Sequence, residues 1–187
     1  SKTKLKKSIL VAGGGPAGIK AACIAADRGH RVTLCEKSNS LGGQINLAQS
    51  LPGRAEFGGI ITNLNKELTK TTVSVRFNSF VNLDLIEELA PDVVIAATGA
   101  TPYMPGIQGA EEAHVVNAWQ VLEGKANVGG SVVIADWRCD WVGLGLAELL
   151  VKQGCHIRLA VNGMVAGQNI PQYARDAWIG KLHKLGV

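Results

Sequence analysis

The residues best suited to chemistry are the glycines of the run GGGPAG, residues 13–18, which directly follows the apolar segment 8–12. Their spacing is Gly-x-Gly-x-x-Gly, in which Gly13 allows a tight turn and Gly15 lets the backbone approach a pyrophosphate. Gly18 allows the helix that follows to pack closely on the preceding strand. Because the N-terminus of that helix presents free N–H groups, the run predicts a phosphate-binding turn.

A carboxylate stands at the position that such a turn requires. Glu36 closes the apolar segment 31–35, from where an acidic residue accepts hydrogen bonds from an adenosine ribose in dinucleotide-binding βαβ units. The turn, the strand, the helix and the acid occur together, which favours dinucleotide binding over a glycine-rich turn without a ligand. NAD and FAD share this pattern, so the first βαβ unit leaves the choice of cofactor open.

The elements that position these residues alternate between strand and helix patterns. Apolar runs predict strands over 8–12, 31–36, 73–77, 92–99, 131–135 and 155–161. Helical spacing predicts helices after residue 16 and over 56–70, 84–90, 141–154 and 171–186. The sequence therefore predicts an α/β fold of tandem Rossmann-like βαβ units with parallel sheets, truncated at the C-terminus. We expect a first domain over residues 1–107 and a second, incomplete domain over residues 108–187.

Charge and cysteine usage exclude several classes of function. The net charge of +4 is carried by four lysines ahead of the first strand, Lys2, Lys4, Lys6 and Lys7, which predicts a solvated arm and no nucleic-acid partner. The 4 cysteines have neither disulfide-framework nor metal-ligand spacing, so we expect a reduced, cytoplasmic protein without a metal site. No apolar run reaches the length of a membrane span, so no membrane association is expected. The 4 histidines are dispersed, and we assign no catalytic residue to this chain.

Two further motifs, together with the first glycine turn, carry a resemblance to a known family. LGGQ, residues 41–44, lies within the long loop 38–57, and ATG, residues 97–99, ends a predicted strand. With the first glycine turn, these motifs resemble the flavoproteins that have two dinucleotide-binding domains. The segment 40–57, SLGGQINLAQSLPGRAEF, resembles the matching loop of the multidomain NADH:flavin oxidoreductases related to old yellow enzyme. That branch includes 2,4-dienoyl-CoA reductase, trimethylamine dehydrogenase and demethylases of N-methylproline and stachydrine.

The resemblance implies that the first site holds FAD, with ADP as the alternative. It implies that the pyrophosphate is lined by Gly13, Gly15, Pro16, Ala17 and Gly18. Glu36 and Lys37 should meet the adenosine ribose, and the backbone of Val81 should contact adenine. Gly43 and Gln44 should lie toward the flavin half, and Thr98 and Gly99 should close over the ligand.

The resemblance also implies parts that this chain does not contain. Members of the branch carry a TIM barrel with FMN and a [4Fe–4S] cluster ahead of this region, and the substrate chemistry takes place there. We therefore expect the chain to be a nucleotide-binding fragment of an oxidoreductase, inactive in isolation, whose full-length form passes electrons to an electron-transfer protein. An NAD(P)H-dependent reductase of the dienoyl-CoA type and a structural ADP-binding module without redox role remain the alternatives.

A second turn, within IADWRCDWVG at residues 134–143, departs from the glycine pattern. Gly143 occupies the last glycine position, but Arg138 and Asp140 stand at the other two. A side chain there would fill the space of a pyrophosphate. An aspartate would also repel it, since two unit charges at 4 Å interact by about 4 kcal/mol at an effective dielectric of 20. The helix dipole contributes only about 0.3–1 kcal/mol in the other direction.

The strand that follows the second turn also lacks its expected acid, because it ends at Val161 and Asn162. We therefore expect the second unit to keep its fold and to have lost NAD(P)H binding. This departure resembles the trimethylamine dehydrogenase side of the family more than the reductase side. Trp137 and Trp141 flank the turn, and we expect them to pack into the emptied pocket, with a stacking platform for a ligand or partner as the alternative.

Overall fold

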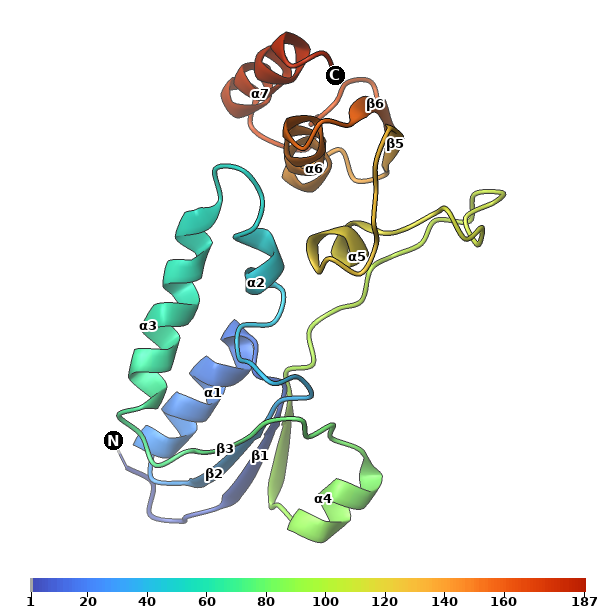
Figure 1. The fold of residues 1–187 in the computed structure, drawn as a ribbon. Helices are drawn as coiled ribbons and strands as arrows, with labels where there is room; N and C mark the ends of the chain where they lie inside the picture. Colours follow the sequence, from blue (N-terminus) through green and yellow to red (C-terminus); the bar gives the residue numbers. More distant parts are fainter. Residues whose placement is uncertain (1) are drawn as a thin grey trace. The chain divides into compact units, whose positions relative to one another are not determined.

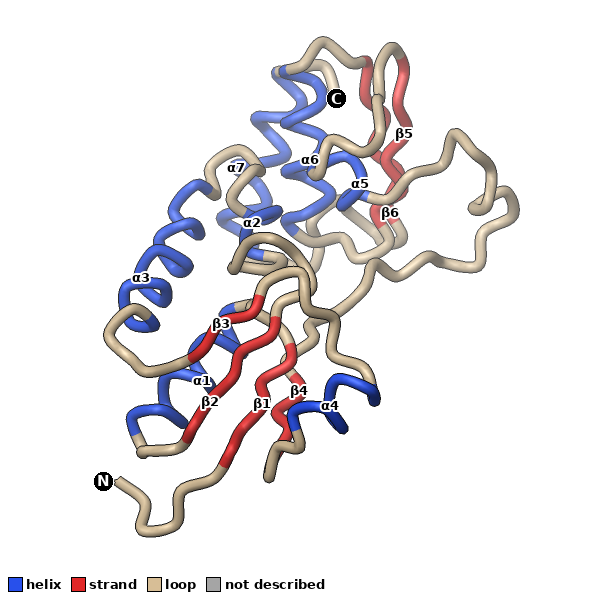
Figure 2. Tube along the Cα trace, turned by 60° about the horizontal axis from the view of Figure 1, so that its bottom comes forward, coloured by secondary structure: helices blue, strands red, loops and turns tan. Residues whose placement is uncertain are grey.

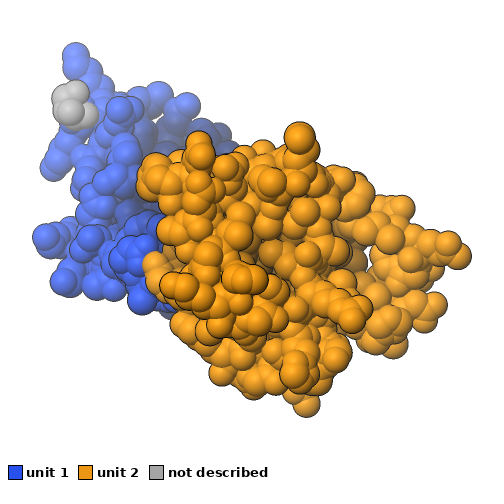
Figure 3. All heavy atoms as spheres, turned by 90° about the horizontal axis from the view of Figure 1, so that it is seen from above, with its two compact units in different colours: residues 1–49, 55–101 blue, residues 50–54, 102–187 orange. Residues whose placement is uncertain are grey.

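The computed structural model describes residues 2–187, which divide into two compact units. The first unit comprises the chain up to Gln49 together with Ala55–Thr101, and the second comprises Ser50–Arg54 together with Pro102–Val187 (Figure 3). The segment Ser50–Arg54 therefore belongs to a different unit from the residues that flank it in sequence. The domain boundary expected after residue 107 stays a prediction.

A four-stranded parallel sheet forms the centre of the first unit (Figures 1 and 2). Its strands are β1 (Ser8–Ala12), β2 (Arg31–Cys35), β3 (Ser74–Arg76) and β4 (Val93–Ala96), in the order β3-β2-β1-β4. Every pairing is parallel, which confirms the predicted α/β class. Ala12 lies opposite Cys35 of β2 and Ala96 of β4, so the residues that follow these strands meet at one edge of the sheet.

The helices of the first unit are α1 (Pro16–Asp27), α2 (Ile45–Ala48), α3 (Gly58–Leu68) and α4 (Leu83–Leu89), with a 3₁₀ turn, η1 (Ala55–Phe57), before α3. Of these, α1 and α3 pack on the sheet with small and aliphatic side chains. Val11 of β1 and Leu34 of β2 are fully buried with Ile19 of α1, and Leu68 of α3 joins the same core. Figure 1 shows α3 running beside α1. Burial of this apolar face holds α1 on the sheet and fixes the turn that precedes it.

The second unit repeats the βαβ pattern on a smaller scale. Its strands β5 (Ser131–Asp136) and β6 (His156–Val161) form a parallel pair, and its helices are α5 (Ala118–Leu122), α6 (Trp141–Lys152) and α7 (Gln172–Lys184). Leu144 and Leu150 of α6 pack with Ile134, Ile157 and Leu182. β5 is one residue longer than the predicted 131–135, because Asp136 still pairs in register with Val161.

Three properties of the described residues, 2–187, bear on the sequence-based expectations. None of their helices is both long enough and apolar enough to cross a membrane. The cysteines at positions 23, 35, 139 and 155 are free thiols and buried. Within the same residues, no group of three or more His, Cys, Asp or Glu side chains is arranged to hold a metal ion.

Candidate functional site

The first turn, residues 13–15, depends on close packing of backbone against backbone. Gly13 has a φ of +111°, which residues with a side chain rarely adopt, and its N–H donates to the carbonyl of Cys35 at 2.8 Å. A Cβ at Gly13 would overlap the carbonyl oxygen of Ala97, and a Cβ at Gly18 would overlap that of Gly13. The first and last glycines of the pattern are therefore required by the turn itself.

Gly15 has the opposite surroundings. It directly precedes α1, which begins with Pro16 and Ala17, and no side chain caps this helix end. A Cβ at Gly15 would meet no atom within 4 Å, and its φ of −75° is open to any residue. Neither crowding nor strain explains this glycine. Open space in front of uncapped helix N–H groups fits an anion such as a pyrophosphate.

Glu36 is buried at the carboxyl edge of the sheet, with 6% of its surface exposed. Its Oε2 accepts from the N–H of Gly14 at 2.6 Å, and its Oε1 accepts from the N–H and the hydroxyl of Ser38, both at 2.8 Å. Burial alone would raise the pKa of Glu36, but these three donors and the charge of Lys37 outweigh burial and lower it. Glu36 is therefore a charged acceptor held in one orientation beside the glycine turn.

The LGGQ segment, residues 41–44, folds back against the same turn. The N–H of Gly42 donates to the carbonyl of Gly14 at 2.9 Å. The side-chain amide of Asn46 donates to the carbonyl of Leu41 at 3.0 Å, which closes the segment on itself. The bond from Gly42 connects the long loop to the turn, although α1 and β2 separate the two in sequence.

The structure brings four further predicted residues to this edge of the sheet. A Cβ at Gly43 would lie 3.3 Å from the Cα of Gly15, and a Cβ at Gly99 would lie 3.3 Å from Nε2 of Gln44. Thr98, between β4 and Gly99, is exposed. The glycine turn, the LGGQ segment and the ATG segment therefore form one surface.

Val81 and Lys37 lie at the periphery of this surface. Lys37 is exposed and follows Glu36 directly. Val81 lies between β3 and α4, just after Ser79, whose N–H donates to the carbonyl of Glu36 at 2.9 Å. The segment that contains Val81 is thus attached to the residue that we expect to meet the ribose.

The second turn, residues 137–140, ends on a carboxylate. Asp140 directly precedes α6, and its Oδ1 accepts from the N–H of Val142 at 2.9 Å. Its Oδ2 lies 2.9 Å from Nε of Arg138. A negative charge of the chain itself therefore caps this helix, at the position where the first turn leaves open space.

Asp136, at the end of β5, lies beneath the last glycine position of this second turn. A Cβ at Gly143 would overlap the Asp136 carboxyl group. Oδ1 of Asp136 accepts from the N–H of Cys139 at 2.9 Å, whereas Oδ2 is buried and has no hydrogen-bond partner among residues 2–187. Burial raises the pKa of Asp136, and the charge of Asp140 adds to the rise. The interior of the turn thus holds two carboxyl groups.

The bulky side chains of the second turn point outward. Trp137 is 45% exposed and the Arg138 side chain is 83% exposed. With Trp141 they help to line an open hollow of about 390 Å³. The expectation that both tryptophans pack into an emptied pocket is therefore wrong for Trp137, because the interior is already occupied by Asp136 and Asp140.

Comparison with known proteins identifies the family to which the chain belongs. The family model described as pyridine nucleotide-disulphide oxidoreductase matches residues 7–187. The chain belongs to this family. Membership in these flavoprotein oxidoreductases implies a bound flavin, FAD, and the open face at Gly15 beside the oriented carboxylate of Glu36 fits the phosphates and the ribose of such a cofactor.

The relatives within the family are named for different activities. An N,N-dimethylglycine/sarcosine dehydrogenase of Chromohalobacter salexigens is 33% identical over 184 residues, covering 92% of this chain and 26% of the relative. An NADH oxidase of Thermoanaerobacter brockii is 39% identical over 185 residues, covering 98% and 28%. A solved structure of 2-naphthoyl-CoA reductase has a TM-score of 0.90 at 30% identity, covering 98% and 28%. The chain thus spans about a quarter of the length of each relative.

Three residues that support the two turns or the LGGQ segment were not predicted from the sequence. Ser38 orients Glu36, Asn46 closes the LGGQ segment, and Asp136 fills the base of the second turn. Asp136 gave one signal, since it is an acid at the end of an otherwise apolar strand. Ser38 and Asn46 lie among other turn residues of the long loop, where no spacing distinguishes them.

Proposed function

We propose that this chain is the nucleotide-binding part of a longer amine-oxidising flavoenzyme, a dehydrogenase or N-demethylase, whose second unit does not take NAD(P)H. The likeness to the dimethylglycine/sarcosine dehydrogenase supports the reaction class. The substrate would be oxidised on a TIM barrel carrying FMN and a [4Fe–4S] cluster, and the electrons would leave through an electron-transfer protein. The single observation that carries the proposal is the Asp140 carboxylate on the N-terminus of α6.

The first site would hold FAD through the surface formed by its three motifs. Gly13, Gly15, Pro16, Ala17 and Gly18 would line the pyrophosphate, and Glu36 with Lys37 would bind the adenosine ribose. Val81 would contact adenine through its backbone, Gly43 and Gln44 would lie toward the flavin, and Thr98 with Gly99 would cover it. FAD supplies the capacity to accept and release electrons, while these residues bind and orient it. ADP uses the same adenylate contacts and stays the alternative occupant.

Electrostatics at the second turn oppose a bound pyrophosphate. The N–H of Val142, which would face a phosphate, already donates to Asp140. Arg138 pairs with Asp140, but this ion pair still occupies the site. The unpartnered oxygen of Asp136 is a second acceptor below the turn. Asn162 follows β6 where Glu36 follows β2, so the ribose acceptor is missing too.

Titration with NADPH tests the proposal. The protein is first saturated with ADP, so that the first site cannot take the adenylate half of the probe. Nicotinamide fluorescence should then show no saturable change at micromolar NADPH. Saturable binding under these conditions would contradict the loss of the second site and favour a reductase.

The likeness to an NADH oxidase favours a second candidate function, an NAD(P)H-dependent reductase. A visible spectrum and cofactor analysis of the complete enzyme separate the possibilities further. FAD together with FMN and a cluster supports electron transfer through the first site. ADP released on denaturation, with FMN as the only flavin, supports a structural nucleotide without a redox role.

A further inference from the structure

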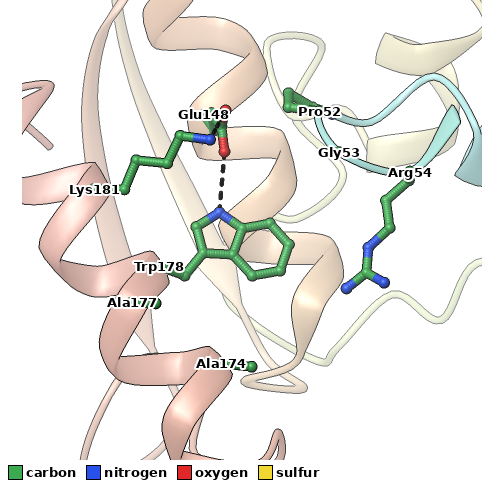
Figure 4. A pocket seen from close by; sticks show the side chains of 8 residues that line it. All are labelled: Pro52, Gly53, Arg54, Glu148, Ala174, Ala177, Trp178 and Lys181. Carbon is green, nitrogen blue, oxygen red and sulfur yellow. Dashed lines mark hydrogen bonds and ion pairs between the residues drawn. The ribbon is translucent and has the colours of Figure 1, made fainter.

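The polar side chains that line the hollow drawn in Figure 4 have partners within the chain. The indole N–H of Trp178 donates to Glu148 at 3.2 Å, and Nζ of Lys181 lies 2.5 Å from the same carboxylate. The guanidinium carbon of Arg54 lies 5.0 Å from the centre of the Trp141 ring and 5.5 Å from that of Trp178, within the range of cation–π attraction. These contacts are made inside the second unit, so they require no ligand.

Ser38 of the first unit differs, because its hydroxyl has more acceptors than it can serve at once. Its Oγ lies 2.8 Å from Oε1 of Glu36 and 2.9 Å from the carbonyl oxygen of Ser40. Both neighbours accept hydrogen bonds, and a hydroxyl carries a single proton. The proton therefore points to one of the two, and rotation of the hydroxyl moves it to the other.

The two carboxylate oxygens of Glu36 have different surroundings. Oε2 accepts from the N–H of Gly14 at 2.6 Å, and a Cβ at Gly14 would meet both this oxygen and the Leu41 side chain. Oε1 accepts from the N–H and the hydroxyl of Ser38, which is exposed. Oε1 is therefore the oxygen on the side that a ligand can reach, and both of its lone pairs already have donors.

A ligand hydroxyl can bind Oε1 of Glu36 only after the Ser38 proton has left this oxygen. The Ser40 carbonyl can take that proton without movement of the backbone, since it already lies at hydrogen-bond distance. The rotated Ser38 hydroxyl then presents a lone pair in place of its proton. Glu36 and Ser38 thereby offer two acceptor oxygens 2.8 Å apart, a separation close to that of two hydroxyl oxygens on adjacent ring carbons.

We propose that Glu36 and Ser38 together recognise the cis-diol of a ribose. One ribose hydroxyl donates to Oε1 of Glu36 and the other to Oγ of Ser38, while the Ser38 proton turns to the Ser40 carbonyl. The inference rests on the proposed function, because it assumes an adenosine nucleotide at the first turn. It makes Ser38 a specificity-determining residue for nucleotides that carry both ribose hydroxyls.

Calorimetric titration with ADP, 2′-deoxy-ADP and 3′-deoxy-ADP tests this assignment. In the parent protein each deoxy analogue should bind about five- to tenfold more weakly than ADP, because one acceptor is left without its donor. In Ser38→Ala the loss for one analogue should fall to within about twofold, because its acceptor is gone. The loss for the other analogue, whose missing hydroxyl is the one that binds Glu36, should remain.

Two further variants separate recognition from a change in the loop. Ser38→Ala keeps the backbone N–H that donates to Glu36, so this variant removes the hydroxyl alone. Ser38→Thr restores a hydroxyl and should restore both losses. Ser74→Ala makes the same chemical change at an exposed position of β3 and should leave all three affinities unchanged.

Two results with Ser38→Ala overturn the proposal while ADP still binds. If both losses equal those of the parent, Ser38 recognises neither hydroxyl. If both losses disappear, Ser38 acts only by orienting Glu36 and does not contact the ribose. Absence of ADP binding in the parent protein has a different meaning, since it contradicts the nucleotide site itself and with it the proposed function.

Discussion

The two turns of this chain share a strand–turn–helix arrangement but differ in the groups that lie inside them. Each joins a parallel strand to a helix, and the third residue of each helix is a glycine, Gly18 or Gly143, where a Cβ would not fit. In the first turn the backbone of Gly13 lies beneath that glycine, and in the second the Asp136 carboxyl group lies there. Both turns therefore need the last glycine for the packing of helix on strand. In the first turn Gly13 is also required by the backbone, whereas Gly15 is not, and its open surroundings leave the helix end free. Fold and ligand site can therefore be lost separately.

The largest difference should appear when each last glycine is replaced by alanine. Gly18→Ala forces a methyl group into backbone and should lower the free energy of unfolding by about 3 kcal/mol. Gly143→Ala overlaps the Asp136 carboxyl group, part of which can rotate away, so we expect a smaller loss of about 2 kcal/mol. Urea unfolding followed by circular dichroism measures both. Equal losses would mean that the Asp136 carboxyl group is as rigid as the backbone beneath Gly18.

Gly15→Ala should separate ligand binding from stability. A methyl group at this position meets no atom of the chain within 4 Å, so the free energy of unfolding should stay unchanged. The same methyl group stands where we place the pyrophosphate and should weaken ADP binding about tenfold or more. Calorimetric titration with ADP measures the affinity, with Gly59→Ala, also without close neighbours, as the control. Unchanged affinity in Gly15→Ala would remove the pyrophosphate from this turn.

Asp140→Ala should show that the second turn is capped by its own chain. Loss of the bond to the N–H of Val142 should lower the free energy of unfolding by about 1 kcal/mol. Asp140→Ser keeps a capping oxygen without the charge and should recover most of this loss. Thermal unfolding of the two variants side by side measures the difference. If serine is no better than alanine, the role of Asp140 is its ion pair with Arg138 and not the cap.

Asp136→Asn should give the smallest effect, and one that depends on pH. The raised pKa of Asp136 in the folded protein means that its contribution to stability is complete below the pKa of an unfolded aspartate and is lost as pH rises through the folded value. Asparagine carries no charge, so the variant should be more stable than the parent at pH 8 and similar to it near pH 4. Unfolding midpoints across this range test the sign. A larger gain at low pH would contradict the raised pKa.

The fold and the first turn were predictable because their determinants are local. Gly13, Gly15, Gly18 and Glu36 occupy fixed offsets from two apolar strands, and parallel register then brings them to one edge. The positions of Gly43 and Gly99 followed from the resemblance. Sequence spacing alone does not say that a residue after α1 and β2 returns to the turn.

The sequence predicts that the second turn lacks two glycines, but it does not predict which side chains occupy its interior. Arg138 and Asp140 stand at glycine positions, and that much is read from the sequence. The outward direction of Trp137 depends on Asp136, whose carboxyl group turns inward beneath Gly143. Whether a side chain of this turn points into the interior or toward solvent depends on the packing of the whole turn. The sequence around the turn has no spacing that indicates the direction.

The assignment of Ser50–Arg54 to the second unit bears on whether the first unit can be produced by truncation. A chain shortened to end at Thr101 would keep Leu51 but lose α6, where a Cβ at Gly145 would lie 3.3 Å from the Leu51 side chain. It would also lose both rings that hold Arg54. The shortened piece would display an apolar and a cationic side chain with their partners removed. We therefore expect that truncation at Thr101 disturbs the first unit, and that point substitutions test its residues more cleanly.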